Sequence, residues 1–316
     1  MNPADRPSVE TIKSLLKETV RVYLTLIKIM VPTIIVVKIL DSLGGVELLA
    51  WLLSPLMTLV GLPDILVIVW ATAMVSNLYA AMTVFYELSG THVFTVAEIS
   101  VLSVMLLLSH GLPVEGGIAK AVGVRWSITL TLRIGGALLL GALTMSVYQW
   151  GDWQQQPIAL IWQPELRSPL LVDWALEQLK LLTVIFFVIL GLIGLLKLLR
   201  YWGIERFMHW FLTPFLKALT MSRNACNVTV IGITLGLSFG GGLLIHEVQQ
   251  GGIDKRDTLL SICFLGLCHS LIEDTLLMLL LGADIHAILW GRLAFAILVI
   301  TLVARMINRN SAVDPR

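Results

Sequence analysis

Two short segments of this chain place ionisable side chains inside apolar runs. Residues 108–115 read Leu-Ser-His-Gly-Leu-Pro-Val-Glu, and residues 267–274 read Leu-Cys-His-Ser-Leu-Ile-Glu-Asp. A polar group among apolar residues is costly unless it is paired, and an ionisable group inside a membrane span is a candidate functional site. An imidazole beside carboxylates can exchange protons or bind a ligand. The two segments are therefore the first candidates for chemistry.

The histidines of the two segments, His110 and His269, are separated by 159 residues, and the same offset relates other distinctive residues. It pairs Lys38 with Lys197, Trp51 with Trp210, Ser54-Pro55 with Thr213-Pro214, Glu98 with Asp257, Glu115 with Asp274, Gly123 with Gly282, and Arg133 with Arg292. A constant offset over about 95 residues indicates an internal duplication. We predict two copies of one unit, near residues 20–150 and 179–309.

The composition is that of a multi-pass membrane protein. Hydrophobic residues make up 57% of the chain and charged residues 14%, whereas a typical soluble domain has about 25% charged residues. The mean hydropathy is +0.87. Because a helical span needs about 20 apolar residues, we expect six spans, at residues 22–40, 65–85, 126–147, 181–199, 228–245 and 288–303.

Charge and cysteine content exclude some other classes. The net charge is +1 and no basic cluster is present, so nucleic acid is not an expected partner. The three cysteines, Cys226, Cys263 and Cys268, lie in apolar segments of the second half. They are typical of small buried residues rather than of a disulfide framework.

We predict an all-α polytopic membrane protein with two inverted repeats. Each repeat has three transmembrane helices, a re-entrant helical hairpin and an interfacial amphipathic helix. The expected order is an amphipathic lead (1–20), the first repeat (21–150), an extracytoplasmic linker (151–178), the second repeat (179–309) and a short tail (310–316). The interfacial helices are expected at 46–60 and 204–219, where a tryptophan accompanies a proline that breaks a spanning helix.

The polar-interrupted segments, residues 96–122 and 258–281, are expected to form the hairpins. Gly111 and Pro113 are helix breakers beside His110, and broken backbone at membrane depth is tolerated only where protein or a wet cavity surrounds it. A kinked transmembrane helix is the alternative for each segment.

The distribution of basic residues predicts how the repeats are inserted. No Lys or Arg occurs between Lys38 and Lys120, so the loop after the first span is expected outside and the N-terminus inside. The equivalent loop of the second repeat is expected inside because it carries Arg200, Arg206, Lys217 and Arg223. Opposite insertion needs an odd number of crossings per repeat, which favours three spans plus a hairpin. Both termini are then cytoplasmic in a bacterial inner membrane, although Lys255 and Arg256 fall outside.

We expect a substrate- or ion-binding site formed by polar residues of both repeats. Its candidates are His110, Glu115, Arg133, Asn77, Asn227, Ser238, His269, Ser270, Glu273, Asp274 and Arg292. His269 and Glu273 are four residues apart and share one helix face. The alternative for the arginines is purely structural: Arg133 pairs with Glu115, and Arg292 pairs with Asp274 or Glu273.

Neither a metal, a cofactor nor a catalytic residue is predicted. Suitable ligand types surround His269, but no His-Glu-x-x-His or Cys-x-x-Cys spacing is present. The chain also lacks the Gly-x-Ser-x-Gly elbow of serine hydrolases and a phosphate-binding loop. We therefore do not expect an enzyme.

The paired segments resemble a known family. The motifs Ser109-His110-Gly111 and Cys268 to Asp274, the run 235–247 and the Gly-x9-Arg pattern look like the nucleoside-recognition or gate-domain membrane proteins. This family includes the spore maturation A and B type proteins, and related gate domains have been proposed in the ferrous iron transporter B and in concentrative nucleoside transporters. Here two such domains are fused in one chain. The resemblance implies transport, with hairpins and broken helices around a midplane site.

The expected function is a secondary transporter or flippase that works by alternating access at a midplane site. Half-helix N-termini attract an anionic group, so the solute is expected to be small and polar or anionic, nucleoside-like or a lipid-linked phosphate, with ion coupling. The expected partners are this solute or lipid and the surrounding membrane lipids, and a homo-oligomer is left open. The alternatives are a non-transporting scaffold or signalling protein and an intramembrane metal-dependent enzyme.

Overall fold

The structure, a computed structural model, describes residues 9–43, 45–90, 92–160 and 171–313 and is helical almost throughout these ranges. Five of its helices are long and apolar enough to cross a membrane. Strand pairing in the described ranges is limited to one isolated bridge between Thr95 and Pro157. The predicted class, an all-α polytopic membrane protein, is therefore confirmed.

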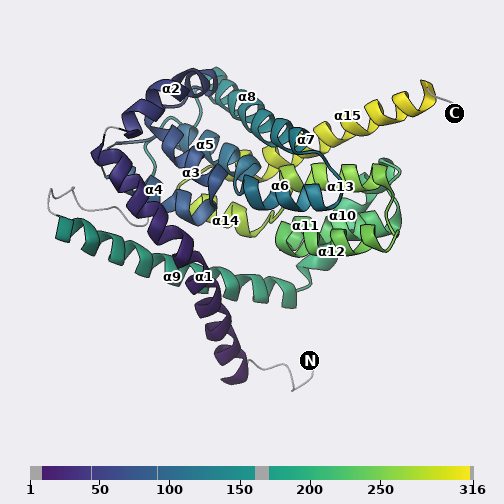
Figure 1. Cartoon of the computed structure of the whole chain (residues 1–316), viewed down its shortest axis with the longest axis horizontal. Coiled ribbons are helices and arrows are strands. Elements are labelled where there is room, and N and C mark those ends of the chain that lie inside the picture. Colours follow the sequence, from purple (N-terminus) through teal and green to yellow (C-terminus); the bar gives the residue numbers. More distant parts are fainter. Residues whose placement is uncertain (1–8, 44, 91, 161–170, 314–316) are drawn as a thin grey trace.

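The two halves of the chain contain a similar series of elements, although η2 and α7 have no separate counterpart in the second half (Figure 1). The first half contains α1 (Val9–Ser42), α2 (Gly45–Val60), η2 (Asp64–Leu66), α3 (Val67–Val75), α4 (Leu78–Ser89), α5 (Val96–Ser109), α6 (Leu112–Ala121), α7 (Trp126–Leu130), η3 (Thr131–Gly135) and α8 (Gly136–Gly151). The second contains α9 (Leu171–Tyr201), α10 (Ile204–Ala218), α11 (Arg223–Leu235), α12 (Leu237–Gln249), α13 (Lys255–Cys268), α14 (Glu273–Leu280), η4 (His286–Gly291) and α15 (Arg292–Val313).

Local structure recurs at the offset of 159 residues. Thr95 caps α5 by accepting a hydrogen bond from the Glu98 amide, and Asp254 caps α13 by accepting from the Asp257 amide. The π-helical turns η3 and η4 also precede the last helix of each half, although their first residues, Thr131 and His286, are 155 positions apart. The first helices cross where the Tyr23 hydroxyl donates to the Leu182 carbonyl at 3.1 Å. Tyr23 and Leu182 are themselves 159 residues apart.

The segment 65–85, predicted as a span, forms a helical hairpin instead. Helix α3 lies beside the end of α5, where the Trp70 indole N–H donates to the Ser109 hydroxyl at 2.7 Å. Helix α4 then returns beside α14, where the Tyr86 hydroxyl donates to the Leu280 carbonyl at 3.3 Å. The helix is interrupted because the Asn77 side chain accepts from the Ala80 amide and starts a new helix. A run long enough for one span is thus folded into two half-length helices.

The segment 228–245, also predicted as a span, is the second hairpin. Helix α11 packs along α13, and the Thr229 hydroxyl donates a hydrogen bond to Ser261 at 2.9 Å. Helix α12 then runs back and packs against α6. The turn lies at Gly236, whose φ of 93° and ψ of 163° belong to a region that only glycine occupies readily.

The segments predicted as hairpins, 96–122 and 258–281, instead form interrupted helices with the dimensions of a membrane span, which we call broken spans. This form agrees with the kinked-helix alternative. Helices α5 and α6 together form one 26-residue element with the length and hydropathy of a span, as do α13 and α14. Each break consists of an extended histidine followed by a left-handed residue, Gly111 (φ 60°) or Ser270 (φ 45°). In each half, the segment predicted as a hairpin thus has the dimensions of a span, and the segment predicted as the middle span folds into two short helices.

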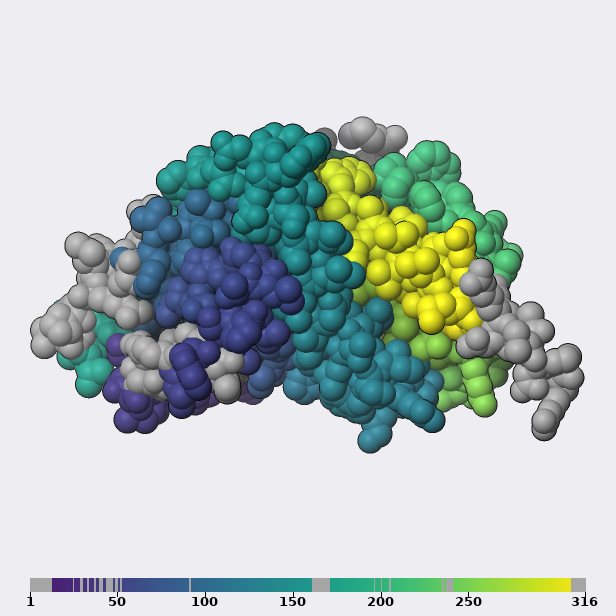
Figure 2. Space-filling view, turned by 90° about the horizontal axis from the view of Figure 1, so that it is seen from above, coloured from purple at the N-terminus to yellow at the C-terminus, as the bar shows by residue number. Residues whose placement is uncertain are grey.

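The broken spans cross the centre of the molecule in opposite directions. The amide of Asp284, beyond the end of α14, donates to the Ser100 hydroxyl near the start of α5 at 2.7 Å. Both spans are 72% buried over their apolar windows, against 33% for α7–α8. In Figure 1, α14 lies among helices of the first half and α6 beside helices of the second, so the halves interlock. From above, α15 lies beside the first half (Figure 2).

Peripheral elements follow the predictions with two corrections. The predicted amphipathic lead is not a separate element, because α1 already begins at Val9, and α9 begins at Leu171 inside the predicted linker. Trp162, Pro164 and Pro169 of that linker lie outside the described residues. Helices form where the interfacial helices were predicted (α2 and α10), and their equivalent tryptophans, Trp51 and Trp210, are 74% and 71% exposed. This exposure suits side chains at headgroup depth.

Candidate functional site

The two breaks bring the two predicted histidines into contact. His110 ends α5 and His269 ends α13, and their Nε2 atoms lie 3.1 Å apart. Their side chains are almost completely buried, with exposed fractions of 8% and 3% for the residues. The candidate site is therefore formed by both halves, at the point where the broken spans meet.

Backbone contacts fix which nitrogen of each imidazole carries a hydrogen. The His110 Nδ1 atom lies 2.9 Å from the Leu106 carbonyl, and the His269 Nδ1 atom lies 2.8 Å from the Leu265 carbonyl. A carbonyl oxygen only accepts, so each Nδ1 must be the donor. In the neutral rings the two Nε2 lone pairs then point at each other, which is repulsive unless a proton or a cation lies between them.

Two carboxylates face the same pair of nitrogens. Glu115 is in the first turn of α6, and its Oε1 lies 3.5 Å from His110 Nε2 and 3.3 Å from His269 Nε2. Asp274 is in the first turn of α14, and its Oδ2 lies 4.0 and 3.9 Å from these atoms. Both carboxylates are buried, and the N-terminal ends of the helices stabilise their negative charges.

The two buried arginines satisfy carbonyls at the breaks. Arg133 donates from Nε to the Leu108 carbonyl at 2.7 Å, and its Nη1 pairs with Glu115 Oε2 at 2.6 Å. Arg292 donates to the carbonyls of Leu267 and His269 at 3.0 and 2.8 Å. These carbonyls belong to the last residues of the interrupted helices, which lack intrahelical partners. The pair of Arg133 with Glu115, which the structural alternative for the arginines expected, is thus found. The described contacts of Arg292 are to backbone.

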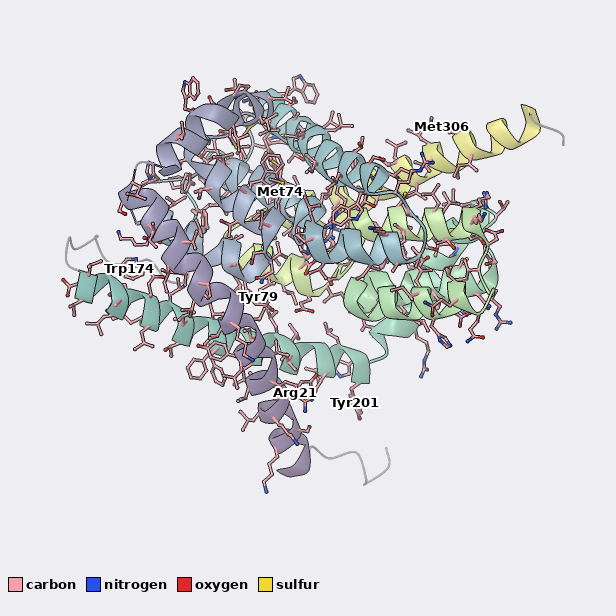
Figure 3. The ribbon with its side chains drawn as sticks, viewed as in Figure 1. Arg21, Met74, Tyr79, Trp174, Tyr201 and Met306 are labelled. Carbon is pink, nitrogen blue, oxygen red and sulfur yellow. The ribbon has the colours of Figure 1, made fainter. Side chains whose placement is uncertain are left out.

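The turn regions of the two hairpins, α3–α4 and α11–α12, each form a backbone hydrogen bond with one of the helix breaks. The Gly111 amide donates to the Ala73 carbonyl and the Leu271 amide to the Ile233 carbonyl, both at 2.8 Å. The Tyr79 hydroxyl, at the start of α4, lies 3.3 Å from Glu273 Oε1. Figure 3 shows Tyr79 near the middle of the molecule, between α4 and α14. Each break is therefore held by backbone hydrogen bonds to a hairpin.

The other predicted site residues lie at helix starts, on helix faces or next to the second break. Asn77 is the N-cap of α4, and Asn227 is exposed on α11. Ser238 is in α12, and its side chain lies outside the described part of the chain. Ser270 is the left-handed residue after His269 and packs against Gly236. Tyr79 was missed, although a hydroxyl two residues after Asn77 in an apolar segment is a usable signal.

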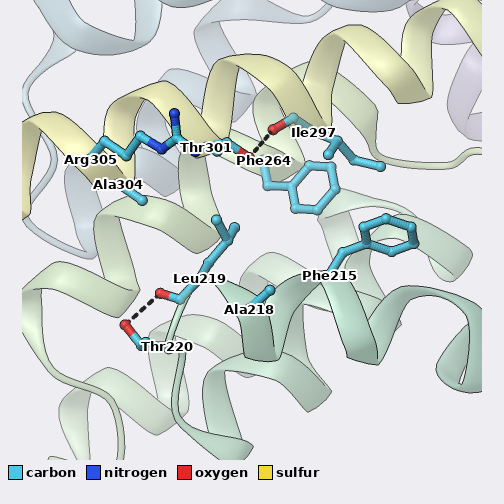
Figure 4. Close-up of a pocket in the computed structure, with 9 residues that line it drawn as sticks. All are labelled: Phe215, Ala218, Leu219, Thr220, Phe264, Ile297, Thr301, Ala304 and Arg305. Carbon is cyan, nitrogen blue, oxygen red and sulfur yellow. Dashed lines mark hydrogen bonds between the residues drawn. The ribbon is translucent and has the colours of Figure 1, made fainter.

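The side chains of His110, His269, Glu115 and Asp274 form the central cluster, and none of them lines the pockets at residues 215–305, 122–259 or 140–291. One of these pockets, about 280 Å³ in volume, lies between α10, α13 and α15, with Phe215 and Phe264 on one side and Thr301 on α15 (Figure 4). The four ionisable groups of the cluster are meanwhile buried. The side chains around these four groups therefore leave them little exposed surface.

Fold and site together define a multi-pass helical membrane protein with a buried ionisable centre between two similar halves. The chain is 30% identical over 290 residues to an uncharacterized membrane protein, YvoD, of Bacillus subtilis (strain 168), and the match covers 89% of each chain. The chain thus belongs to the same family of membrane proteins as YvoD. No family model matches the chain, and no solved structure matches it.

Proposed function

We propose that this protein is a secondary transporter or flippase of the bacterial inner membrane, with its site at the His110–His269 contact. The observation that carries the proposal is that two hairpin tips and two helix breaks converge on buried ionisable groups. Broken helices and hairpins around a central site are typical of transporters that work by alternating access. The resemblance to gate-domain proteins supports the same class, rather than an enzyme.

Helices α6 and α14 begin at the two breaks, and α4 and α12 begin beside them, as the contacts of Tyr79 with Glu273 and of Gly236 with Ser270 show. Their N-terminal ends favour a negative group, and the guanidinium groups of Arg133 and Arg292 add positive charge nearby. These features favour a small polar or anionic solute, nucleoside-like or a lipid-linked phosphate, with an ion bound at the same centre. Opening would require the two interlocked halves to move against each other.

The segment predicted as a hairpin and the segment predicted as the middle span have exchanged roles in each half. This exchange supports a membrane orientation that agrees with the distribution of basic residues. The bridge between Thr95 and Pro157 joins the start of α5 to the linker, which supports one membrane side for both. The bond from Arg256 to the Leu219 carbonyl, 2.8 Å long, places the start of α13 beside the end of α10. Lys255 and Arg256 then share one side with Lys120, Arg125, Arg206, Lys217 and Arg223. The exception that Lys255 and Arg256 made to the positive-inside rule in the sequence prediction is thereby removed.

Cysteine labelling tests this orientation. With the buried native cysteines replaced, Gln250→Cys is expected to label from the cytoplasmic side and Val93→Cys, at an 85% exposed position, from the opposite side. The arrangement predicted from sequence requires the reverse for both positions. Arg125→Cys and Asp152→Cys serve as controls, because both arrangements place the first inside and the second outside. Labelling of Gln250→Cys from outside and of Val93→Cys from the cytoplasmic side would contradict the proposed orientation.

Uptake into proteoliposomes tests the transport function. A labelled nucleoside and a short-chain lipid-linked phosphate are the two probes, and the wild-type protein is expected to move one of them faster than empty liposomes do. Asp274→Asn is expected to reduce uptake at least about tenfold, because an interaction with a charged group is worth about 1.5–3 kcal/mol and about 1.4 kcal/mol corresponds to tenfold.

The matched control for uptake is Asp152→Asn, which changes an exposed carboxylate in the same way. It is expected to transport at the wild-type rate. If the wild-type protein moves neither probe, the transport proposal fails in favour of a scaffold or signalling protein. If Asp274→Asn and Asp152→Asn are equally active, the central cluster is not the transport site.

A further inference from the structure

The histidine cluster has the arrangement of ligand atoms that surrounds a metal ion. His110 Nε2, His269 Nε2 and Glu115 Oε1 form a triangle with sides of 3.1, 3.3 and 3.5 Å. With metal–ligand bonds of about 2.0–2.1 Å and tetrahedral angles, two ligand atoms lie about 3.3 Å apart. The triangle therefore has the size of one face of a tetrahedral coordination shell.

The carboxylate of Asp274 offers a further ligand atom for a metal ion at the same site. Ligand atoms of His110, His269 and Asp274 all lie within 4.8 Å of one another. Its Oδ2 atom is buried and has no hydrogen-bond partner among the described residues. A buried carboxylate oxygen without a partner is costly. A cation beside the two Nε2 atoms would satisfy it.

The surrounding hydrogen bonds are those of metal-ligating histidines. A histidine that binds metal usually donates its other ring N–H to a carbonyl or a carboxylate, which fixes the tautomer and the ring orientation. Both histidines do so here, through Leu106 and Leu265. Glu115 is similarly held by Arg133 through its other oxygen. All three ligands are thus already oriented toward one point.

We propose that His110, His269, Asp274 and Glu115 bind one divalent transition-metal ion of the Zn²⁺ type. Two imidazole nitrogens with carboxylate oxygens suit zinc and its first-row neighbours, whereas Mg²⁺ and Ca²⁺ prefer oxygen ligands alone. A proton shared by the two imidazoles would also relieve the Nε2 contact, but it would leave Asp274 Oδ2 without a partner. Because each half supplies one histidine and one carboxylate, the ion joins the two halves at their contact.

Metal binding can be measured on the full-length protein in detergent, purified with a histidine-free tag and stripped with a chelator. Titration with Zn²⁺, and with Co²⁺ as a spectroscopic probe, is expected to give one ion per chain and Co²⁺ absorption bands typical of nitrogen and oxygen ligands. Mg²⁺ and Ca²⁺ are expected not to compete. His269→Ala is expected to weaken binding at least about 100-fold, because the loss of an outer-shell partner alone costs 10- to 100-fold.

Two further variants keep the test decisive. Asp274→Asn preserves the shape of the side chain and is expected to weaken Zn²⁺ binding, whereas His286→Ala removes an exposed histidine outside the cluster and is expected to bind normally. The metal proposal is overturned if the wild-type protein binds no Zn²⁺, or if the double variant His110→Ala/His269→Ala binds as the wild type does. Binding without any uptake would instead contradict the transport function alone.

Discussion

Arg133→Ala is expected to destabilise the folded protein by about 3–5 kcal/mol, the usual cost of removing one partner from a buried ion pair. Arg133 is completely buried, and its Nη1 lies 2.6 Å from Glu115 Oε2. Its loss leaves a buried negative charge and also frees the Leu108 carbonyl. Thermal or denaturant unfolding in detergent measures the effect.

The double variant Arg133→Ala/Glu115→Gln separates charge from packing. It removes the uncompensated charge while keeping the hydrogen-bonding shape of Glu115, so a large part of the lost stability should return. Arg223→Ala, at an exposed position, is the control and is expected to stay within about 0.5 kcal/mol of the wild type. Equal stability of Arg133→Ala and Arg223→Ala would contradict a structural role for the Arg133–Glu115 pair.

Gly236→Ala is expected to disrupt the second hairpin tip. The backbone conformation at Gly236 alone costs other residues on the order of 1–3 kcal/mol. A Cβ atom there would also lie 2.5 Å from the Ser270 hydroxyl oxygen. The expected result is a lower unfolding temperature together with faster proteolysis near residue 236.

Gly242→Ala, in the same hairpin, is the matched control. A Cβ at Gly242 meets nothing within 4 Å, so alanine is expected to be neutral or to stabilise helix α12 by up to about 1 kcal/mol. Adding Ser270→Gly to Gly236→Ala removes the clash but not the backbone strain, and partial recovery is expected. If Gly236→Ala behaves like Gly242→Ala, the tip does not depend on this conformation.

The contact between the halves could be predicted from the sequence, but the roles of two segments could not. The offset that pairs His110 with His269 identified the residues that meet, and the neighbouring charges identified the pair of Arg133 with Glu115. Apolar length, in contrast, cannot distinguish one span from a hairpin of two half-length helices. The distinction depends on the backbone conformations of Asn77 and Gly236, and the spacing of Gly236 and Gly240 is equally typical of helix packing.

The partners of Arg292 were also beyond the reach of the sequence. The sequence pattern suggested the carboxylates of Glu273 or Asp274 as partners of Arg292. A sequence shows which side chains can accept a hydrogen bond, but it does not show which backbone carbonyls are free to do so. The break at His269 creates additional acceptors, namely the carbonyls of Leu267 and His269 that no longer bond within the helix. These acceptors follow from the three-dimensional course of the chain, and they could be recognised only once the break was located.

The contact of Tyr23 with Leu182 and that of His110 with His269 each join a residue to its own counterpart. Self-pairing of this kind is the signature of an isologous interface, in which a two-fold axis relates identical subunits. In a true homodimer every substitution would appear on both sides of that axis. A single chain escapes this constraint, so Gly111 can stand opposite Ser270, and the two faces of the centre can become chemically different.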